Sequence, residues 1–306
     1  MRMTNNENHE KNHERTLITS INSFLDALRN LDENDYYKRE YFFRGHANVN
    51  WEPLPSIYRN EKWIKNEDLM IKDLISRCPN DFQNHKYTFQ SLVKMQHYSL
   101  PTRLLDVTAN PLVALYFSCQ PEKIKNESDV EIESDGEVLV FCAFKDSIKY
   151  HDSDTVSVIS NIAKRPKDFD LSEAPKSEKE IKAFNATQKI QLLLHEIRHE
   201  KPHFESKIQR DHLESVVFVR PLLDNPRIIK QEGAFILFGI NNKKTNPAKI
   251  SEIYLPRVKR PRLIIPAQKK EGLLKELEVL GVSNSTIFPD IDNVAKFIKS
   301  RYLNEK

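Results

Sequence analysis

Apolar residues recur at helical or strand spacing along most of the chain after residue 15. A first helix is predicted where Ile18, Ile21, Phe24, Leu25 and Leu28 share one face, with Thr19 or Ser20 as the N-cap. Further helices are predicted at about 61–77, 86–97, 111–119, 177–200, 267–280 and 291–303. Strands are predicted at 41–44, 137–144, 215–220, 233–239, 250–255 and 262–265. Because strands and helices do not alternate regularly, the pattern predicts a mixed α+β fold.

Three segments interrupt this pattern. Residues 1–15 are polar without periodicity, so we expect a disordered tail. Residues 121–136 are charged and rich in serine, and are predicted as a loop. The stretch of about 145–212, rich in Lys, Glu and His, is interpreted as a helical insertion in a single domain that spans 16–306. No internal repeat is visible.

The most informative stretch runs from Gln96 to Thr108, where a turn between two hydrophobic elements contains a His, an Arg, an Asp and two Thr. Polar side chains converge on such turns more often for chemistry than for folding. Asn110-Pro111 follows it and is a strong helix start, since proline suits the first helical position. We therefore expect a ligand to bind at this turn.

Composition narrows the possible classes of protein. The apolar fraction of 39% and charged fraction of 30% are ordinary for a soluble protein, and a net charge of +3 gives no general affinity for nucleic acid. One local basic group (Arg257, Lys259, Arg260 and Arg262) is bracketed by prolines and is predicted as a solvated loop. With only six glycines, no Gly-rich phosphate loop is present.

The expected compartment is the cytoplasm. Cys78, Cys119 and Cys142 lack metal-ligand spacing and are typical of buried thiols in a reducing environment. No apolar run approaches the roughly 20 residues that span a bilayer, and the first residues are too polar for a signal peptide.

Five segments in order resemble the FRG domain family. They are Tyr41–His46 (YFFRGH), Trp51–Arg59 (WEPLPSIYR), Gln96–Phe117, Arg227–Phe235 (RIIKQEGAF) and Thr286–Phe297 (TIFPDIDNVAKF). The family has a suspected kinship with ADP-ribosyltransferases. The resemblance therefore implies a mixed split sheet with NAD bound as a substrate in its cleft.

On that resemblance, Arg44 and Gly45 seat the dinucleotide. A guanidinium can fork onto pyrophosphate or ribose oxygens, and a residue without Cβ lets a flat carboxamide approach the backbone. The alternative is that Arg44 forms a structural ion pair and Gly45 only turns the chain.

The proline-rich bend supplies the next candidates. Arg103, with Thr102 beside it, would hold phosphate charge, while Asp106 and His97 would act around the ribose. Equally, Arg103 and Asp106 could pair with each other and fix the bend. Tyr116 is a weaker candidate for nucleotide contact, since an aromatic residue on such an apolar helix is more often core.

The segment Arg227–Phe235 provides Gln231, which is predicted to orient the acceptor. ADP-ribosyltransferases usually place a Glu on a late strand to stabilise the oxocarbenium-like centre. If Gln231 points into the cleft, the alternation along a strand turns Glu232 away. The carboxylate then comes from Asp106 or is absent.

A zinc hydrolase is the rival from another class. His195-Glu196-Ile197-Arg198-His199 has the spacing of a zincin helix, with His203, His212 or Glu214 as a third ligand. Pro202 and Arg198 argue against it, and a solvated helix face is the simpler interpretation; no metal is expected.

The sequence thus predicts an NAD-handling enzyme, an ADP-ribosyltransferase or an NAD glycohydrolase, with a macromolecule or water as acceptor. Such chemistry is consistent with a toxin or anti-phage effector. The alternatives are a non-catalytic nucleotide-binding module and, third, the zinc hydrolase.

Overall fold

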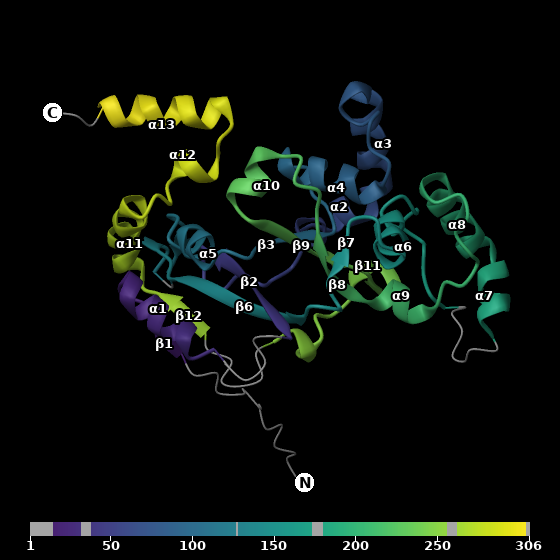
Figure 1. Cartoon of the computed structure of the whole chain (residues 1–306), viewed down its shortest axis with the longest axis horizontal. Coiled ribbons are helices and arrows are strands. Elements are labelled where there is room, and N and C mark those ends of the chain that lie inside the picture. Colours follow the sequence, from purple (N-terminus) through teal and green to yellow (C-terminus); the bar gives the residue numbers. More distant parts are fainter. Residues whose placement is uncertain (1–14, 32–37, 127, 173–179, 256–261, 304–306) are drawn as a thin grey trace, which may run out of the picture.

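A twisted sheet crosses the middle of the molecule, with helices at both ends (Figure 1). The computed structural model describes residues 15–31, 38–126, 128–172, 180–255 and 262–303. The strands are β1 (Arg15–Leu17), β2 (Arg39–His46), β3 (Leu104–Thr108), β4 (Lys123–Lys125), β5 (Glu131–Glu133), β6 (Gly136–Phe144), β7 (Lys149–Tyr150), β8 (Val216–Arg220), β9 (Gly233–Phe238), β10 (Ile240–Asn241), β11 (Lys243–Pro247) and β12 (Arg262–Ile265).

The helices fall between these strands without regular alternation. They are α1 (Ile21–Arg29), α2 (Glu61–Lys65), α3 (Glu67–Arg77), α4 (Thr88–His97), α5 (Pro111–Ser118), α6 (Asp154–Ile162), α7 (Ile181–Ala186), α8 (Gln188–Glu200), α9 (Arg210–Glu214), α10 (Pro226–Lys230), α11 (Ala267–Val279), α12 (Asn284–Ile287) and α13 (Ile291–Leu303). Short 3-10 turns lie at η2 (Ser56–Arg59), η3 (Pro79–Asp81) and η5 (Glu252–Tyr254).

Eight of the described strands form the main sheet in the order β1-β12-β6-β2-β3-β9-β8-β7. The outermost pairs, β1 with β12 and β7 with β8, are parallel, and the other pairs are antiparallel. The fold is therefore α+β with a mixed, largely antiparallel sheet. This agrees with the class predicted from the hydrophobic pattern.

The two faces of the sheet are covered differently. On one face, α1, α5 and α11 bury Phe43 and Val140 on one half of the sheet, while α4, α6 and α8 bury Leu104 and Phe235 on the other half. These are two separate cores, and Figure 1 shows the corresponding helices toward opposite ends of the molecule. On the other face, one core that includes Phe42 runs beneath both halves.

Most predicted elements are present, and local chemistry explains their limits. Ser20 is the N-cap of α1 and its side chain accepts a hydrogen bond from the Ser23 backbone. Asn110 caps α5 in the same way, with Pro111 at its first position. The predicted helix at 177–200 breaks at Thr187 into α7 and α8, and its first residues lie outside the described ranges.

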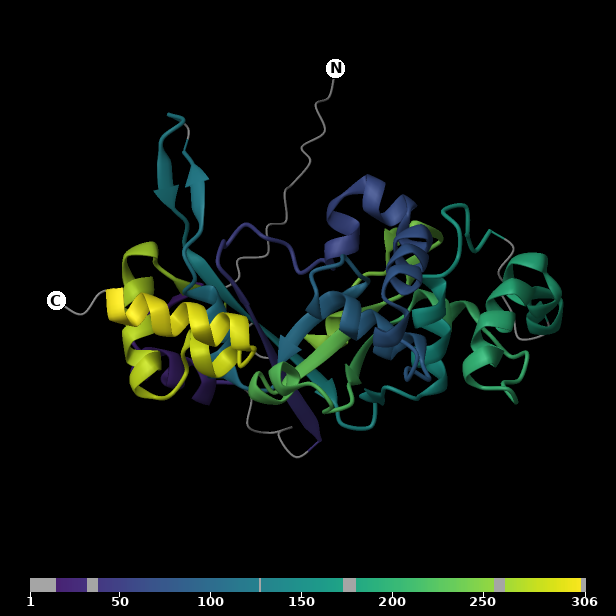
Figure 2. The same cartoon turned by 90° about the horizontal axis from the view of Figure 1, so that it is seen from above.

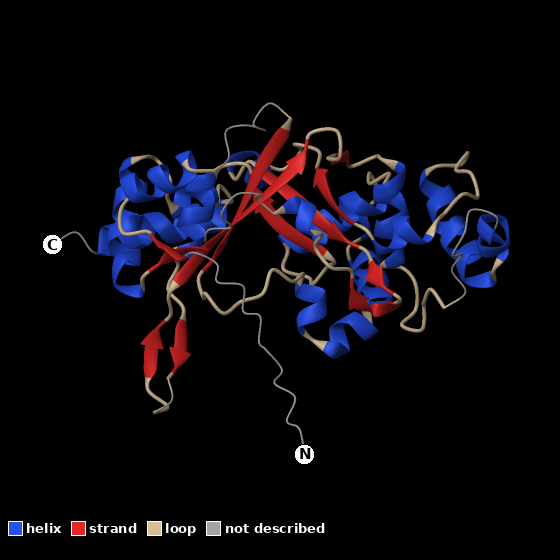
Figure 3. Cartoon of the chain, turned by 90° about the horizontal axis from the view of Figure 1, so that it is seen from below, coloured by secondary structure: helices blue, strands red, loops and turns tan. Residues whose placement is uncertain are grey.

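Three predictions were wrong. The end of the polar turn, Leu104–Thr108, is a central strand, because its alternate residues are buried on the two faces of the sheet. The predicted loop 121–136 contains the β4–β5 hairpin, which stands off the body in Figures 2 and 3. The predicted strand 250–255 is instead a loop around the turn η5.

The helices of the expected insertion share their core with the sheet. Side chains of α6 and α8 pack with α4, β8 and β9 in one cluster. The predicted disordered tail lies outside the described residues except for Arg15, which begins β1. Of the basic group near residue 260, the structure describes Arg262, at the start of β12. Among the described residues, no helix has both the length and the apolarity to cross a membrane.

Candidate functional site

Within the main sheet, the pairing between β2 and β3 is the shortest. These strands share one paired position, Phe43 with Thr108, whereas β2 pairs with β6 over eight positions and β3 with β9 over five. Beyond that position the side chain of Arg44 spans the gap, because its Nη1 donates to the backbone oxygen of Asp106 at 2.7 Å. A side chain thus bridges the two halves where backbone bonds end.

A cavity of about 550 Å³ lies at this gap. Its wall comes from β2, β3, α4, α5, α10 and β9. Five residues singled out from the sequence line it, together with their neighbour Gln96: Arg44, Gly45, His97, Asp106 and Gln231. Thr102, Arg103 and Tyr116 are not in its lining. Segments from Phe43 to Phe235, 192 positions apart in the sequence, therefore meet at one place.

Arg44 is a cation in partly desolvated surroundings. Burial and nearby Arg59 lower its pKa to about 10, while Asp106 opposes the shift, so the guanidinium stays charged at neutral pH. Its Nε donates to His46 Nε2 at 3.0 Å. Burial, Arg44 and Arg59 lower the pKa of His46 to about 3, so this imidazole is neutral and acts as an acceptor. Arg44 thus forms hydrogen bonds within the fold and also lines the cavity.

The Asp106 carboxylate is held by a short relay of hydrogen bonds. The buried hydroxyl of Thr102 donates to Gln96 Oε1 at 2.5 Å, which orients the amide. Gln96 Nε2 then donates to Asp106 Oδ2 at 2.7 Å. Thr102 was predicted to contact a ligand, but it does not line the cavity. It acts instead by orienting Gln96. The Asp106 side chain itself is exposed and lines the cavity.

His97 ends α4 on the cavity wall. Its Nδ1 lies 3.5 Å from Asn225 Nδ2, and its Nε2 lies 3.8 Å from Asp290 Oδ1. Partial burial and the charge of Arg227 lower the pKa of His97, and Asp290 opposes the shift. An uncharged imidazole at neutral pH can accept a proton.

Gln231 lines the cavity, but its position differs from the prediction. It caps α10, and Glu232 follows in the left-handed region with φ of 45°, so neither residue is on β9. Gln231 Nε2 donates to the Ile287 carbonyl at 3.2 Å. Glu232 is turned to Asn110, whose Nδ2 donates to its Oε1 at 2.9 Å. The Glu232 carboxylate is thus outside the cavity lining. The reason is its hydrogen bond to Asn110, and not the alternation of side chains along a strand.

The structure gives Gly45 a packing role. A Cβ on Gly45 would lie 2.0 Å from the Ala114 carbonyl oxygen and 2.6 Å from the Ser118 nitrogen. Because those are backbone atoms of α5, only glycine lets the helix lie this close to β2. Gly45 therefore sets the distance between β2 and α5, which both line the cavity, and the predicted close approach of a carboxamide is not needed to explain it.

Arg103 is fully buried, which contradicts its predicted role in holding phosphate. Its guanidinium forms a forked ion pair with Glu67, with Nε–Oε1 at 3.0 Å and Nη2–Oε2 at 2.5 Å. Nη1 donates to the Phe238 carbonyl, and Lys244 Nζ lies 3.3 Å from the same Glu67. The predicted alternative, a pair with Asp106, is also wrong, because the counter-charge comes from α3.

Tyr116 belongs to the core on the α5 side of the sheet. Tyr116 is 5% exposed, and its hydroxyl lies 3.4 Å from Asn284 Nδ2. The suggestion that it contacts the nucleotide is therefore not supported by its position.

Arg227 is the main lining residue that was not singled out. Its guanidinium stacks over the Phe288 ring at 4.6 Å from the centroid and has no ion pair among the described residues. Trp51, which is 41% exposed, and Phe117 add aromatic surface, and Glu122 adds a second carboxylate. Arg227 and Phe288 lie inside two of the segments that resemble the family, which is the signal that points to them.

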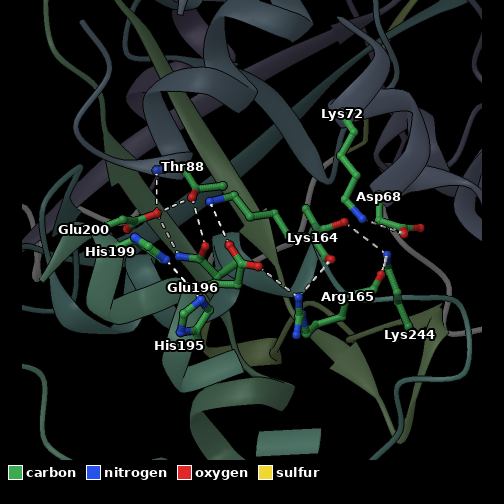
Figure 4. Close-up of polar contacts among 12 residues, drawn as sticks. Asp68, Lys72, Thr88, Lys164, Arg165, His195, Glu196, His199, Glu200 and Lys244 are labelled. Atoms are coloured by element: carbon green, nitrogen blue, oxygen red, sulfur yellow. Dashed lines mark hydrogen bonds and ion pairs between the residues drawn. The ribbon is translucent and has the colours of Figure 1, made fainter. Parts of the chain in front are cut away.

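The zincin-like helix has a different arrangement (Figure 4). His195 and His199 face each other, with their Nε2 atoms 3.1 Å apart. Glu196 is turned away to Lys164 and Arg165, at 3.5 and 3.1 Å. No group of three or more His, Cys, Asp or Glu in the described ranges is placed to hold a metal ion. Glu196 is thus engaged in ion pairs where a zincin needs it on the metal-bound water.

Fold and site together define an α+β protein with a polar and aromatic cavity at the junction of two half-sheets. Residues 39–127 match the FRG domain, which supports the resemblance to that family. The matched residues include Arg44, Gly45, Gln96, His97 and Asp106, which line the cavity. No curated protein and no solved structure matches the chain.

Proposed function

We propose that the cavity binds NAD and that the protein cleaves the bond between nicotinamide and ribose. The observation that carries the proposal is the meeting of Arg44, Asp106, Arg227 and Gln231 around one cavity of about 550 Å³. Ligand sites of this size bury most of a nucleotide-sized molecule, and a few polar groups orient it.

The pyrophosphate is assigned to the two guanidinium groups. Arg44 reaches the cavity from β2 and Arg227 from α10, so the anion is held between the two halves of the sheet. Guanidinium groups form forked, charge-assisted hydrogen bonds with phosphate oxygens. Arg227 takes the role that the sequence gave to Arg103. Trp51 and Phe117 offer flat apolar surface to a planar ring.

The reacting centre is assigned to Asp106. Gln96 holds its carboxylate at 2.7 Å, so the negative charge is in place before the reaction begins. A preorganised carboxylate stabilises the positive charge that develops on the ribose as nicotinamide leaves with the bonding electron pair. The uncharged imidazole of His97 can take the proton of the incoming water or acceptor.

The weak β2–β3 junction favours the ADP-ribosyltransferase kinship inferred from sequence resemblance. A split sheet with a cavity at the split, and an arginine at the end of an early strand, are the features implied by that kinship. On this basis the acceptor is water or a macromolecule. Depletion of NAD or modification of a target would suit a toxin or anti-phage effector.

A nucleotide-binding module without turnover is the second candidate, and one observation favours it. Glu232, the late carboxylate, is bonded to Asn110 and does not line the cavity. Catalysis then depends on Asp106 alone or with Glu122.

Nicotinamide release from NAD by the purified chain tests the proposal. We expect Arg44→Ala and Arg227→Ala each to weaken ADP-ribose binding by about tenfold or more, since hydrogen bonds to charged groups contribute about 1.5–3 kcal/mol. Asp106→Asn should lower kcat by about a hundredfold and change KM little. Arg29→Ala, on the exposed end of α1, is the matched control.

The outcomes separate the candidates. Binding of ADP-ribose without nicotinamide release would favour the binding module. Absence of both, in protein that unfolds cooperatively, would overturn NAD as the ligand.

A further inference from the structure

The helix α13 presents an apolar stripe to solvent. Ile291, Ala295, Ile298 and Tyr302 follow one another at spacings of three or four residues, so they share one side of the helix. All four are exposed, and the exposed fraction is 83% for Ile291, 49% for Ile298 and 70% for Tyr302. Exposed apolar residues that are contiguous mark an interaction site, whereas single ones need no explanation.

This helix lies at the rim of the molecule, where a partner can reach it. Within the chain it packs chiefly on α12. Figure 1 shows α13 beyond α11 and α12, with its C-terminal end directed away from the sheet. Its partly buried apolar residues, Val294 and Phe297, lie to one side of the stripe. Among the described residues that line the main cavity, none belongs to α13, so a partner on the stripe leaves the ligand site open.

Two opposite charges border the stripe on its other side. Asp292 directly follows Ile291 and Lys299 directly follows Ile298, so both lie along the same edge of the stripe. They are about two helical turns, or about 10 Å, apart, which is too far for an ion pair within one helix. Both side chains are exposed, and neither has an ion pair in the part of the chain that the structure describes. The edge is thus acidic toward one end and basic toward the other.

We propose that the stripe of α13 packs against the same stripe of a second copy of this chain, with the two helices antiparallel. This orientation sets Ile291 against Tyr302 and Ala295 against Ile298, so apolar side chains meet along the whole contact. Ala295, the small residue near the centre, lets the two helix axes approach closely. The same surface serves on both chains, as a dimer with twofold symmetry requires.

Charge complementarity selects both the occupant and the orientation. In the antiparallel pair, Asp292 of each chain lies near Lys299 of the other, so two ion pairs flank the apolar contact. A parallel pair would place like charges beside each other and align the two helix dipoles. A membrane surface fits less well, because a helix that lies in a bilayer interface has a basic polar face, whereas this stripe is bordered by a carboxylate.

The contact is short, so we expect a weak dimer. The 13 residues of α13 span about 20 Å. Two such helices bury less surface than the roughly 1,600 Å² of a standard stable complex, so the dissociation constant should be on the order of 10 µM. Sedimentation equilibrium at protein concentrations of about 1–200 µM covers this range.

Charge reversal tests the pairing directly. Asp292→Lys or Lys299→Asp alone puts like charges opposite each other at two places, so each change should weaken the dimer about tenfold or more. The first variant has only basic residues at these two positions and the second only acidic ones. An equimolar mixture of the two should therefore form a heterodimer about as tight as the wild-type dimer. Asp211→Lys, the same change at an exposed residue of α9, should leave dimerisation unchanged.

Ile298→Asp tests the apolar contact, because it places a charge at the centre of the stripe. This variant should stay monomeric at every concentration, with the helix content of the wild type by circular dichroism. A wild-type chain that is monomeric at about 200 µM, far above the expected dissociation constant, would overturn the proposal. So would charge variants that fail to associate when mixed.

Binding of the monomeric wild-type chain to vesicles of phosphatidylserine and phosphatidylcholine, lost in Ile298→Asp, would assign the stripe to a membrane surface and refute the dimer. None of these measurements depends on NAD cleavage. The dimer and the proposed function can therefore fail separately.

Discussion

At the scale of single residues, burial divides arginines that look alike in the sequence. Arg44 and Arg103 both lie in polar motifs next to apolar residues, yet Arg44 reaches the cavity and Arg103 is locked to Glu67. The position of Arg44 could be predicted because it follows three aromatic residues on a strand. The burial of Arg103 could not be predicted, because its counter-charge lies 36 residues earlier, on a helix whose packing the local pattern does not define.

His46 makes the stability of the fold sensitive to acid. Its pKa is lowered from 6.5 to about 3 in the folded chain, so below pH 6.5 the unfolded chain binds a proton that the folded chain does not. Stability is therefore lost as pH falls from 6.5 toward 3, by about 2 kcal/mol between pH 6.5 and pH 5. His46→Gln keeps an acceptor for Arg44 Nε but does not titrate. Urea unfolding of this variant should show a smaller loss over that interval, and identical losses would contradict this role.

At the scale of elements, capping and periodicity predicted most helices, but close approach between elements could not be predicted. The Asn110-Pro111 start of α5 was readable from two residues. The strand β3 was missed because its five residues follow a proline-rich bend and alternate between two buried faces, which gives no polar stripe. The contact between Gly45 and α5 also could not be predicted, because it depends on tertiary packing.

Gly45→Ala should destabilise the fold severely. Because the new Cβ would meet the backbone of α5 at 2.0 Å, the helix must move, at a cost of about 3 kcal/mol or more. The free energy of unfolding in urea is the measurement. Gly272→Ala is the matched control, since nothing lies within 4 Å of its added Cβ inside α11, and it should stabilise by about 0.5–1 kcal/mol. Equal effects of the two changes would refute the packing role.

At the scale of the whole molecule, the cavity depends on the far end of the chain. Phe288, Ile287 and Asp290 contact Arg227, Gln231 and His97, so the segment between α12 and α13 supports the wall that α10 provides. The α+β class and the gathering of Arg44, Asp106 and Gln231 could be inferred from ordered motifs. The contact of the last motif with Arg227 could not, because it joins residues that only the fold brings together.

Phe288→Ala should therefore weaken binding of ADP-ribose without unfolding the protein. Loss of the ring removes the stacking partner of Arg227, and a cation–π contact contributes about 0.5–2 kcal/mol, so we expect a loss of about twofold to thirtyfold in affinity. Isothermal calorimetry measures it. Ile291→Ala, at a side chain 83% exposed on the next helix, should bind as the wild type does. Unchanged affinity in Phe288→Ala would show that Arg227 does not need this support.

The lone backbone pairing between Phe43 and Thr108 has a mechanical consequence. The two helix-covered cores are joined across the sheet by that contact, by Arg44, by the contacts of Arg227 and Gln231 with Phe288 and Ile287, and by the apolar layer on the opposite face. A ligand that contacts residues on both sides of the gap would be a non-covalent crosslink between these two cores. Binding at this place should make the two units melt as one, so occupancy of the cavity is coupled to the cooperativity of the entire chain.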